Sequence, residues 1–325
     1  MTTFNNQLSS NRVVFIDNLK CFAIICVIFG HSLQYTYNGY LDDLKSFNLI
    51  YSFHMPLFMM LSGYFAQSSL TLNARDFFKK KSVQLLLPAL TWSVVKILLS
   101  GGSNIFSNLI GSFWFLKSVF LCYSITYIVF KIIKYEKIAA AILFLTPFVV
   151  FINFYTYMLN YMLPCFVFGI MLRKNINYAL EHRTEAGIIS LMLFIVLLPL
   201  WTFSEYYYTN VWDNGIFSIK NEIIYIHRLV LGLSGSLFLF IIFSNFTKTT
   251  NLIKTIGAST LGLYVMNAIF CDIQRHVLPC TISSEILCIA ASIFFITFQL
   301  AVFIPTIILL KKNRATSVFF LGITR

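Results

Sequence analysis

The chain is a succession of long apolar runs separated by short polar breaks. A helix that crosses a membrane needs about 20 mainly apolar residues, and runs of about that length recur along the whole sequence. The pattern predicts an all-α integral membrane protein, a bundle of about ten transmembrane helices in a single domain over residues 1–325. The predicted spans are roughly 15–35, 47–66, 82–100, 112–130, 138–153, 156–173, 186–203, 223–244, 255–272 and 286–310.

The fifth and sixth spans leave an alternative open. Both runs are short, and only the stretch around residues 153–157 joins them. A re-entrant pair would also satisfy this pattern, because non-helical backbone is tolerated at membrane depth where protein surrounds it.

Composition and charge agree with a membrane protein. The chain is 58% hydrophobic and 11% charged, with a mean hydropathy of +0.79, which excludes a water-soluble fold. The net charge of +12 comes from basic residues in short loops, so it indicates topology and contact with membrane lipids and gives no support to nucleic acid as a partner. Most of the 24 basic residues fall in loops of one side. The positive-inside rule then predicts a multi-pass protein of the plasma or inner membrane with both termini in the cytoplasm.

Three ionisable residues, Asp17, Lys20 and His31, lie in the first apolar run, FIDNLKCFAIICVIFGHSL. Such residues are costly inside a span and commonly face the interior of the bundle. The eleven residues from Lys20 to His31 turn a helix by about 1100°, roughly three full turns, so the two side chains share a face about 16 Å apart along the axis. An elongated anion such as coenzyme A could reach from one to the other. The alternative for Lys20 is snorkelling to the interface beside Asp17.

Other polar residues fall at a depth similar to that of His31 when the spans alternate in direction. These candidates for binding the substrate or stabilising an oxyanion are His54, Trp114, Lys117, Arg228, Tyr264 and Asn267. The alternative is a belt of interfacial residues at the headgroup level, which would gather at the same depth.

A basic cluster, Arg75, Lys79, Lys80 and Lys81, precedes the third span. It could pair with nucleotide phosphates, and the alternative is topology together with anionic lipid. The sequence contains no P-loop, GxGxxG, GxSxG or HExxH pattern, so nucleotide-driven pumps, serine hydrolases and zinc proteases have no support. No cluster with the spacing of metal ligands is present, and we expect no metal.

Several motifs, in order along nearly the whole chain, resemble those of the membrane-bound acyltransferase family 3, which includes bacterial O-acetyltransferases of surface glycans. Asp17-Asn18-Leu19-Lys20 followed by His31 is similar to the family's first-span signature. The further matching stretches are FHMPLFMMLSGYF, KKKSVQLLLPAL, WFLKSVF, PCFVFG and IGASTLGLYVMN. The last stretch usually ends in histidine in the family, and here it ends in Asn267.

The resemblance implies an O-acetyltransferase with His31, Asp17 and Lys20 in the catalytic roles. The donor would be acyl-coenzyme A, most often acetyl-coenzyme A, used as a co-substrate, with no permanently bound cofactor. The acceptor would be a hydroxyl of a cell-surface or lipid-linked carbohydrate. We expect His31 to act as the general base, and Lys20 to hold coenzyme A phosphates together with the basic cluster. The rival interpretations are a transporter or flippase for a glycan or lipid intermediate, and a scaffold or lipid-binding membrane protein.

Overall fold

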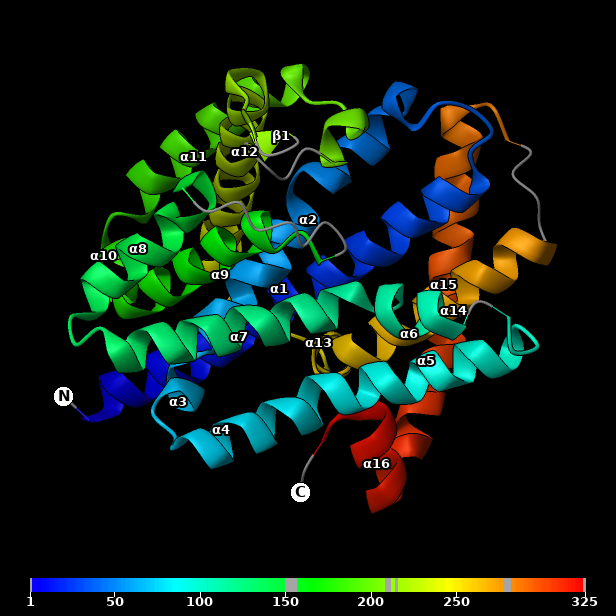
Figure 1. Cartoon of the computed structure of the whole chain (residues 1–325), viewed down its shortest axis with the longest axis horizontal. Coiled ribbons are helices and arrows are strands. Elements are labelled where there is room, and N and C mark those ends of the chain that lie inside the picture. Colours follow the sequence, from blue (N-terminus) through cyan, green and yellow to red (C-terminus); the bar gives the residue numbers. More distant parts are fainter. Residues whose placement is uncertain are drawn as a thin grey trace. The chain divides into compact units, whose positions relative to one another are not determined.

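The computed structural model describes residues 2–103, 105–149, 157–207, 212–213, 216–277 and 282–323 (Figure 1). Almost every described element is a helix. The longer helices are α1 (Thr2–Thr36), α2 (Lys45–Tyr64), α4 (Ala74–Lys81), α5 (Leu87–Leu99), α7 (Trp114–Ile132), α8 (Glu136–Val149), α9 (Leu159–Lys174), α11 (Arg183–Leu197), α12 (Ile219–Ser244), α14 (Thr260–Val277), α15 (Glu285–Lys312) and α16 (Arg314–Leu321).

Short elements connect these helices. They are η1 (Leu41–Asp43), α3 (Gln67–Leu70), the π-helical segment η2 (Ser82–Leu86), α6 (Ile105–Gly111), α10 (Ile176–Glu181), η4 (Leu198–Leu200), η5 (Phe203–Tyr207), α13 (Asn251–Gly257) and the two-residue strands β1 (Trp212–Asp213) and β2 (Ile216–Phe217). The strands pair antiparallel, with Trp212 opposite Phe217.

Six helical segments in the described part of the chain are long and apolar enough to cross a membrane. They are Val14–Thr36, Ala74–Leu99, Trp114–Ile132, Arg183–Leu200, Ile219–Ser244 and Glu285–Lys312. A seventh results if the bent pair α13 and α14 counts as one span. The chain is therefore an all-α protein with several membrane-spanning helices.

The remaining predicted spans coincide with helices that do not meet the same length and hydropathy limits. The predicted span 47–66 falls on α2, the span 156–173 on α9, and the span 138–153 on α8. Residues 150–153 and 156 lie outside the described part of the chain. A total of ten spans stays a prediction.

The chain folds as two compact units, each built from three segments of sequence. The first unit comprises Met1–Phe58, Asn177–Ser204 and Leu231–Ile308. The second comprises Met59–Ile176, Glu205–Val230 and Leu309–Arg325.

In the second unit, the end of α2 and the middle of α9 cross with their backbones in contact. A Cβ added to Gly63 would collide with the carbonyl oxygen of Phe166, and one added to Gly169 would collide with that of Met60. Small residues at such crossings let membrane helices approach closely. The glycines of FHMPLFMMLSGYF and PCFVFG therefore hold these two stretches together.

Another part of the second unit is a long rod formed by α4, η2 and α5, which run on as one helix in Figure 1. The C-terminal helix α16 packs against α5, and the indole of Trp92 donates to the carbonyl of Phe320 at 2.9 Å. Gly322, at φ +64°, ends α16 against the backbone of Gln84 in the π-helical segment. A side chain at position 322 would be strained and would collide with that backbone.

In the first unit, α1 packs along both α13 and α14. The two helices are bent by 71° at the break between Gly257 and Thr260. On α1 the buried residues recur every three or four positions, as in Leu19, Ala23 and Val27, which gives the helix one continuous packed face.

Candidate functional site

The candidate site of the first unit lies along α1. The segment IGASTLGLYVMN contacts this helix at both ends of the stretch from Asp17 to His31. A Cβ added to Gly257 would lie 2.6 Å from the carbonyl oxygen of Asp17, so α13 meets the α1 backbone one turn before Lys20. The amide of Asn18 also donates to the carbonyl of Lys248 at 2.9 Å. Only glycine permits this approach of the two backbones.

The other end of the same segment reaches His31. The Nδ1 atom of His31 and Oδ1 of Asn267 are 2.7 Å apart. Beyond this point α14 continues beside α1 in the same direction, because Gln274 donates to the Thr36 hydroxyl at 3.3 Å. The 71° bend thus allows one short segment to contact α1 near Lys20 and again at His31.

Asn267 is held by a third helix. Its Nδ2 donates to Oε1 of Gln299 on α15 at 2.8 Å, and both amides are fully buried at 0% exposure. The thiol of Cys271, one turn further along α14, lies 3.8 Å from Asn267 Oδ1. His31, Asn267 and Gln299 form a polar chain contributed by α1, α14 and α15, which we call the His31 relay.

The relay determines which nitrogen of His31 can act as a base. The side-chain oxygen of Asn267 is only an acceptor, so His31 Nδ1 carries the proton and donates it to that oxygen. In the neutral imidazole the lone pair then lies on Nε2. In the orientation that the structure gives the two amides, Asn267 presents its oxygen to His31 and its amino group to Gln299. An imidazole with a fixed Nε2 lone pair is arranged for accepting a proton from a hydroxyl.

Polar residues of α2 lie beside the same end of α1. The hydroxyl of Tyr51 donates to Oε1 of Gln34 at 3.0 Å, and Gly30 leaves room for the Tyr51 ring. That ring lies edge to face with His54, with the ring centres 4.6 Å apart. His54 is 1% exposed, and its Nδ1 lies 2.8 Å from the carbonyl of Ile50. Because the carbonyl can only accept, His54 is also fixed in one tautomer.

The remaining predicted residues of the first unit are half-buried. Asp17 and Lys20 sit one turn apart on α1. Tyr264 is three residues before Asn267, on the same side of α14. The first unit therefore contains Asp17, Lys20, His31, His54, Tyr264 and Asn267 from the predicted set.

The second unit contains the basic cluster of α4, and its members differ in environment. Arg75, Lys79 and Lys80 are exposed. Lys81 is only 6% exposed, and its ammonium lies 3.6 Å from the centre of the Tyr123 ring. A cation over an aromatic face at this distance is a stabilising pair. Three of the four cations are thus open to anionic groups, while Lys81 is engaged in packing.

Lys117, predicted as an oxyanion donor, already has its ammonium group engaged in hydrogen bonds within the protein. Its ammonium donates to the carbonyl oxygens of Leu109, Ile110 and Ser112 around the end of α6. A lysine has three donors, so all of them are used. This geometry favours a structural role for Lys117 at a helix C-terminus. Trp114, one turn earlier, is half-buried at the start of α7.

Arg228 is the largest of the fully buried side chains among the described residues, at 2% exposure. Its guanidinium carbon lies 4.0 Å from the centre of the Tyr161 ring, and the Tyr161 hydroxyl donates back to the Arg228 carbonyl at 3.3 Å. Nearby, Tyr225 donates to the Asn160 carbonyl at 3.1 Å. A buried cation of this kind is costly and marks a candidate functional position.

Sequence reasoning missed Gln299, Gln34 and Tyr51. The signal for Gln299 was present, because it is a lone amide in the apolar run SIFFITFQLAVF, where a polar side chain needs a buried partner. Tyr51 and Gln34 gave no comparable signal, since both are common near the ends of spans.

Comparison with known proteins places these residues in a family context. A family model described as an acyltransferase domain matches residues 13–311. Nodulation protein NolL of Sinorhizobium fredii (strain NBRC 101917 / NGR234) is 30% identical over 202 residues, which cover 54% of this chain and 54% of that protein. Nodulation protein NolL of Mesorhizobium japonicum (strain LMG 29417 / CECT 9101 / MAFF 303099) is 30% identical over 131 residues, 35% of each chain. The match thus spans about half the length of the first relative. No solved structure matches the chain.

Proposed function

The chain belongs to the acyltransferase family 3, and on that premise we propose that it is a membrane O-acyltransferase. In this proposal it moves an acyl group, most simply acetyl, from acyl-coenzyme A to a hydroxyl of a cell-surface or lipid-linked carbohydrate. The observation that carries the proposal is the His31 relay, because it leaves Nε2 of a histidine in the matched region with the lone pair that a general base needs.

In the proposed reaction His31 takes up one proton from the acceptor and gives one proton to the leaving group. Nε2 of His31 takes the proton of the acceptor hydroxyl while its oxygen attacks the thioester carbonyl. The carbon–sulfur bond breaks, and the coenzyme A sulfur leaves with the proton that His31 carried. The products are an ester and the free thiol, and Nδ1 stays protonated against Asn267 throughout. Asn267 can support the imidazolium by accepting this hydrogen bond.

Lys20 is proposed to bind an anionic group of the donor. It lies on the same face of α1 as His31, about 16 Å away along the axis. A long molecule with phosphates at one end and a thioester at the other matches this separation. The exposed cations Arg75, Lys79 and Lys80 are open to phosphates of coenzyme A or of lipid headgroups, and each is a separate candidate.

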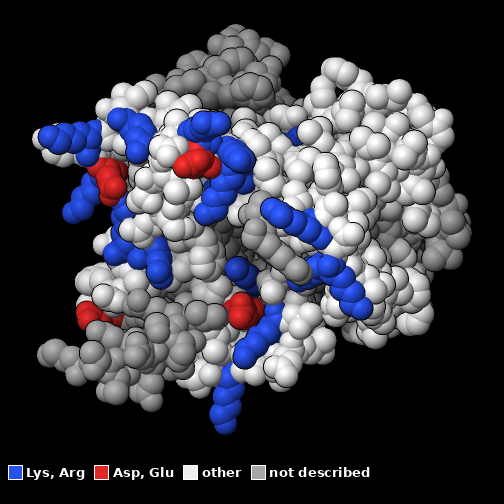
Figure 2. Space-filling model, turned by 90° about the horizontal axis from the view of Figure 1, so that it is seen from below, with Lys and Arg blue, Asp and Glu red and all other residues white. Residues whose placement is uncertain are grey.

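We also propose the plasma or inner membrane, with both termini in the cytoplasm. The support is the excess of basic residues in the loops of one side. Lys and Arg outnumber Asp and Glu on the face shown in Figure 2. In this orientation Lys20 is near the cytoplasm, where acyl-coenzyme A is available.

The proposal is tested by mass spectrometry of surface and lipid-linked glycans from cells with wild-type protein, with His31→Ala and without the gene. We expect an O-acetyl group that is present with the wild type and absent in the other two. His31→Gln is a second variant, since glutamine keeps a donor for Asn267 but cannot act as a base. An identical acetyl content in all strains would refute the proposal, as would full activity of His31→Gln.

The same cells distinguish the proposed acyltransferase from a transporter without covalent chemistry. That interpretation predicts translocation that does not depend on the acyl donor. When membranes are incubated with labelled acetyl-coenzyme A, the label incorporated into the glycan fraction should increase with the amount of wild-type protein that they contain. Incorporation that is the same with the His31→Ala protein would count against transfer by this chain.

A further inference from the structure

A groove of about 350 Å³ lies between α11 and α12, entirely within the first unit. Arg183, Gly187 and Leu191 line it from α11, and Phe238 and Ile241 line it from α12. These residues on α11 are spaced by four, so they form one stripe of the helix. None of the residues that line the groove belongs to a motif that carries the proposed function.

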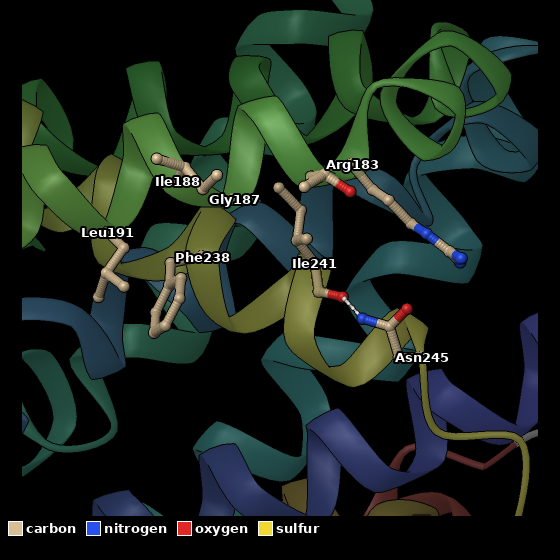
Figure 3. A pocket seen from close by; sticks show the side chains of 8 residues that line it. Arg183, Gly187, Ile188, Leu191, Phe238, Ile241 and Asn245 are labelled. Atoms are coloured by element: carbon tan, nitrogen blue, oxygen red, sulfur yellow. Dashed lines mark hydrogen bonds between the residues drawn. The ribbon is translucent and has the colours of Figure 1, made fainter.

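One end of the groove is cationic and polar. Figure 3 shows Arg183 and Asn245 together at this end, with the Asn245 amide donating to the Ile241 carbonyl at 3.1 Å. The donation leaves the Asn245 oxygen near the arginine. Within the described residues Arg183 has no acidic partner and is exposed. Its guanidinium thus offers its donors to an anion that comes from outside the protein.

The other end is apolar and faces the membrane. Leu191 and Phe238 lie at this end in Figure 3, and Ile188, which also lines the groove, is 51% exposed. Phe238 also lines a second cavity of about 390 Å³, whose other lining residues include Phe22, Phe53 and Phe194. An apolar surface therefore continues from the groove past Phe238.

The position of the groove along the span identifies the surroundings of each end. Arg183 is the first residue of the candidate span Arg183–Leu200, so it lies at the level of the headgroups, and Leu191 lies about 12 Å deeper. Only 6% of that span is buried, so α11 is surrounded mainly by lipid. A ligand of this groove would have an anionic group at the interface and a hydrocarbon chain directed into the membrane.

We propose that the groove between α11 and α12 binds an anionic glycerophospholipid. Its phosphate would pair with Arg183 beside Thr184 and Asn245, and one acyl chain would lie along Leu191 and Phe238. Basic pockets between membrane helices recognise anionic headgroups in this way. A free anion would make no use of the apolar end. In a zwitterionic lipid such as phosphatidylcholine, the choline cation offsets the attraction between the phosphate and the guanidinium, so a lipid with a net negative charge fits this end better.

The test is native mass spectrometry of the full-length protein from micelles that hold equal amounts of phosphatidylglycerol and phosphatidylcholine with the same acyl chains. We expect the wild type to retain phosphatidylglycerol in preference. Arg183→Gln should lower the ratio of retained phosphatidylglycerol to phosphatidylcholine by about fivefold, the factor that corresponds to about 1 kcal/mol for one cation near a membrane surface. Lys254→Gln, an exposed cation of α13 outside the groove, is the matched control and should leave the ratio unchanged.

A second variant tests the apolar part. A Cβ at Gly187 would lie 3.3 Å from Cγ2 of Ile241, so Gly187→Leu fills the groove and should reduce retention of both lipids. Equal ratios for the wild type and Arg183→Gln would overturn the proposal, as would an equal effect of Lys254→Gln. Displacement of phosphatidylglycerol by millimolar inorganic phosphate would also overturn it, because the site would then be a simple anion site.

Discussion

Replacing Asn267 by leucine removes the acceptor of His31 Nδ1 without a large change in volume. The bond is 2.7 Å long and Asn267 is fully buried, and a leucine side chain at this position offers His31 Nδ1 no acceptor. A buried donor left without a partner costs about 1–3 kcal/mol. If that cost appears in the transition state, where the imidazole is protonated, the rate falls by about 5- to 150-fold at about 1.4 kcal/mol per factor of ten.

The assay is the initial rate of transfer from labelled acetyl-coenzyme A to the glycan fraction of membranes, divided by the amount of protein. We expect Asn267→Leu to lower kcat with little change in KM for the donor, because the relay does not contact the donor's phosphates. Gln299→Leu should have a smaller effect in the same direction, since it removes only the bond that orients Asn267.

Gln274→Leu is the matched control for this prediction. Gln274 is also a buried amide of α14 that bonds to α1, but its partner is Thr36. Gln274→Leu should leave kcat unchanged if the loss of kcat in Asn267→Leu comes from the hydrogen bond to His31. A wild-type kcat for Asn267→Leu would refute the reasoning, and so would an equal loss for Gln274→Leu, which would point to helix packing.

Other predictions concern the ends of the site and the second unit. Lys20→Ala should weaken coenzyme A binding, measured by titration calorimetry, by about tenfold, the loss of one charge-assisted bond; unchanged affinity would assign Lys20 to topology alone. Gly257→Val should lower the free energy of unfolding by about 1–3 kcal/mol because its Cβ would meet the Asp17 backbone; an unaltered Tm would contradict this packing. Tyr161→Leu should lower the free energy of unfolding by about 2 kcal/mol, because the buried Arg228 guanidinium would lose its aromatic partner and face an aliphatic side chain. A Tm in detergent equal to that of the wild type would argue against this pair.

Periodicity was enough to predict α1 and the shared face of Lys20 and His31, because a single straight helix fixes which residues point together. The ends of several other spans were predicted within a few residues for the same reason. For example, the predicted span 286–310 falls on the segment Glu285–Lys312. Long apolar runs with polar flanks leave little freedom in where a helix must lie.

The relay could not be predicted in this way. His31 and Asn267 are separated by 236 positions in the chain, and no local period relates residues at that distance. The predicted span 255–272 also concealed the 71° bend. GAST carries no proline, and Gly257 and Ser259, although they are residue types found at kinks, are also common where straight membrane helices pack closely. The π-helical segment at 82–86 has no local signal either, since its side chains would suit an ordinary helix.

The hydrogen bond from Asn267 to Gln299 has an evolutionary consequence. An asparagine at position 267 needs an acceptor on α15 to keep its oxygen toward His31, whereas a histidine there has a different shape and a single N–H to satisfy. The two positions should therefore substitute together among relatives. Chains with asparagine at 267 should carry glutamine or another acceptor at 299, and chains with histidine at 267 should place the acceptor for its ring N–H at a different position.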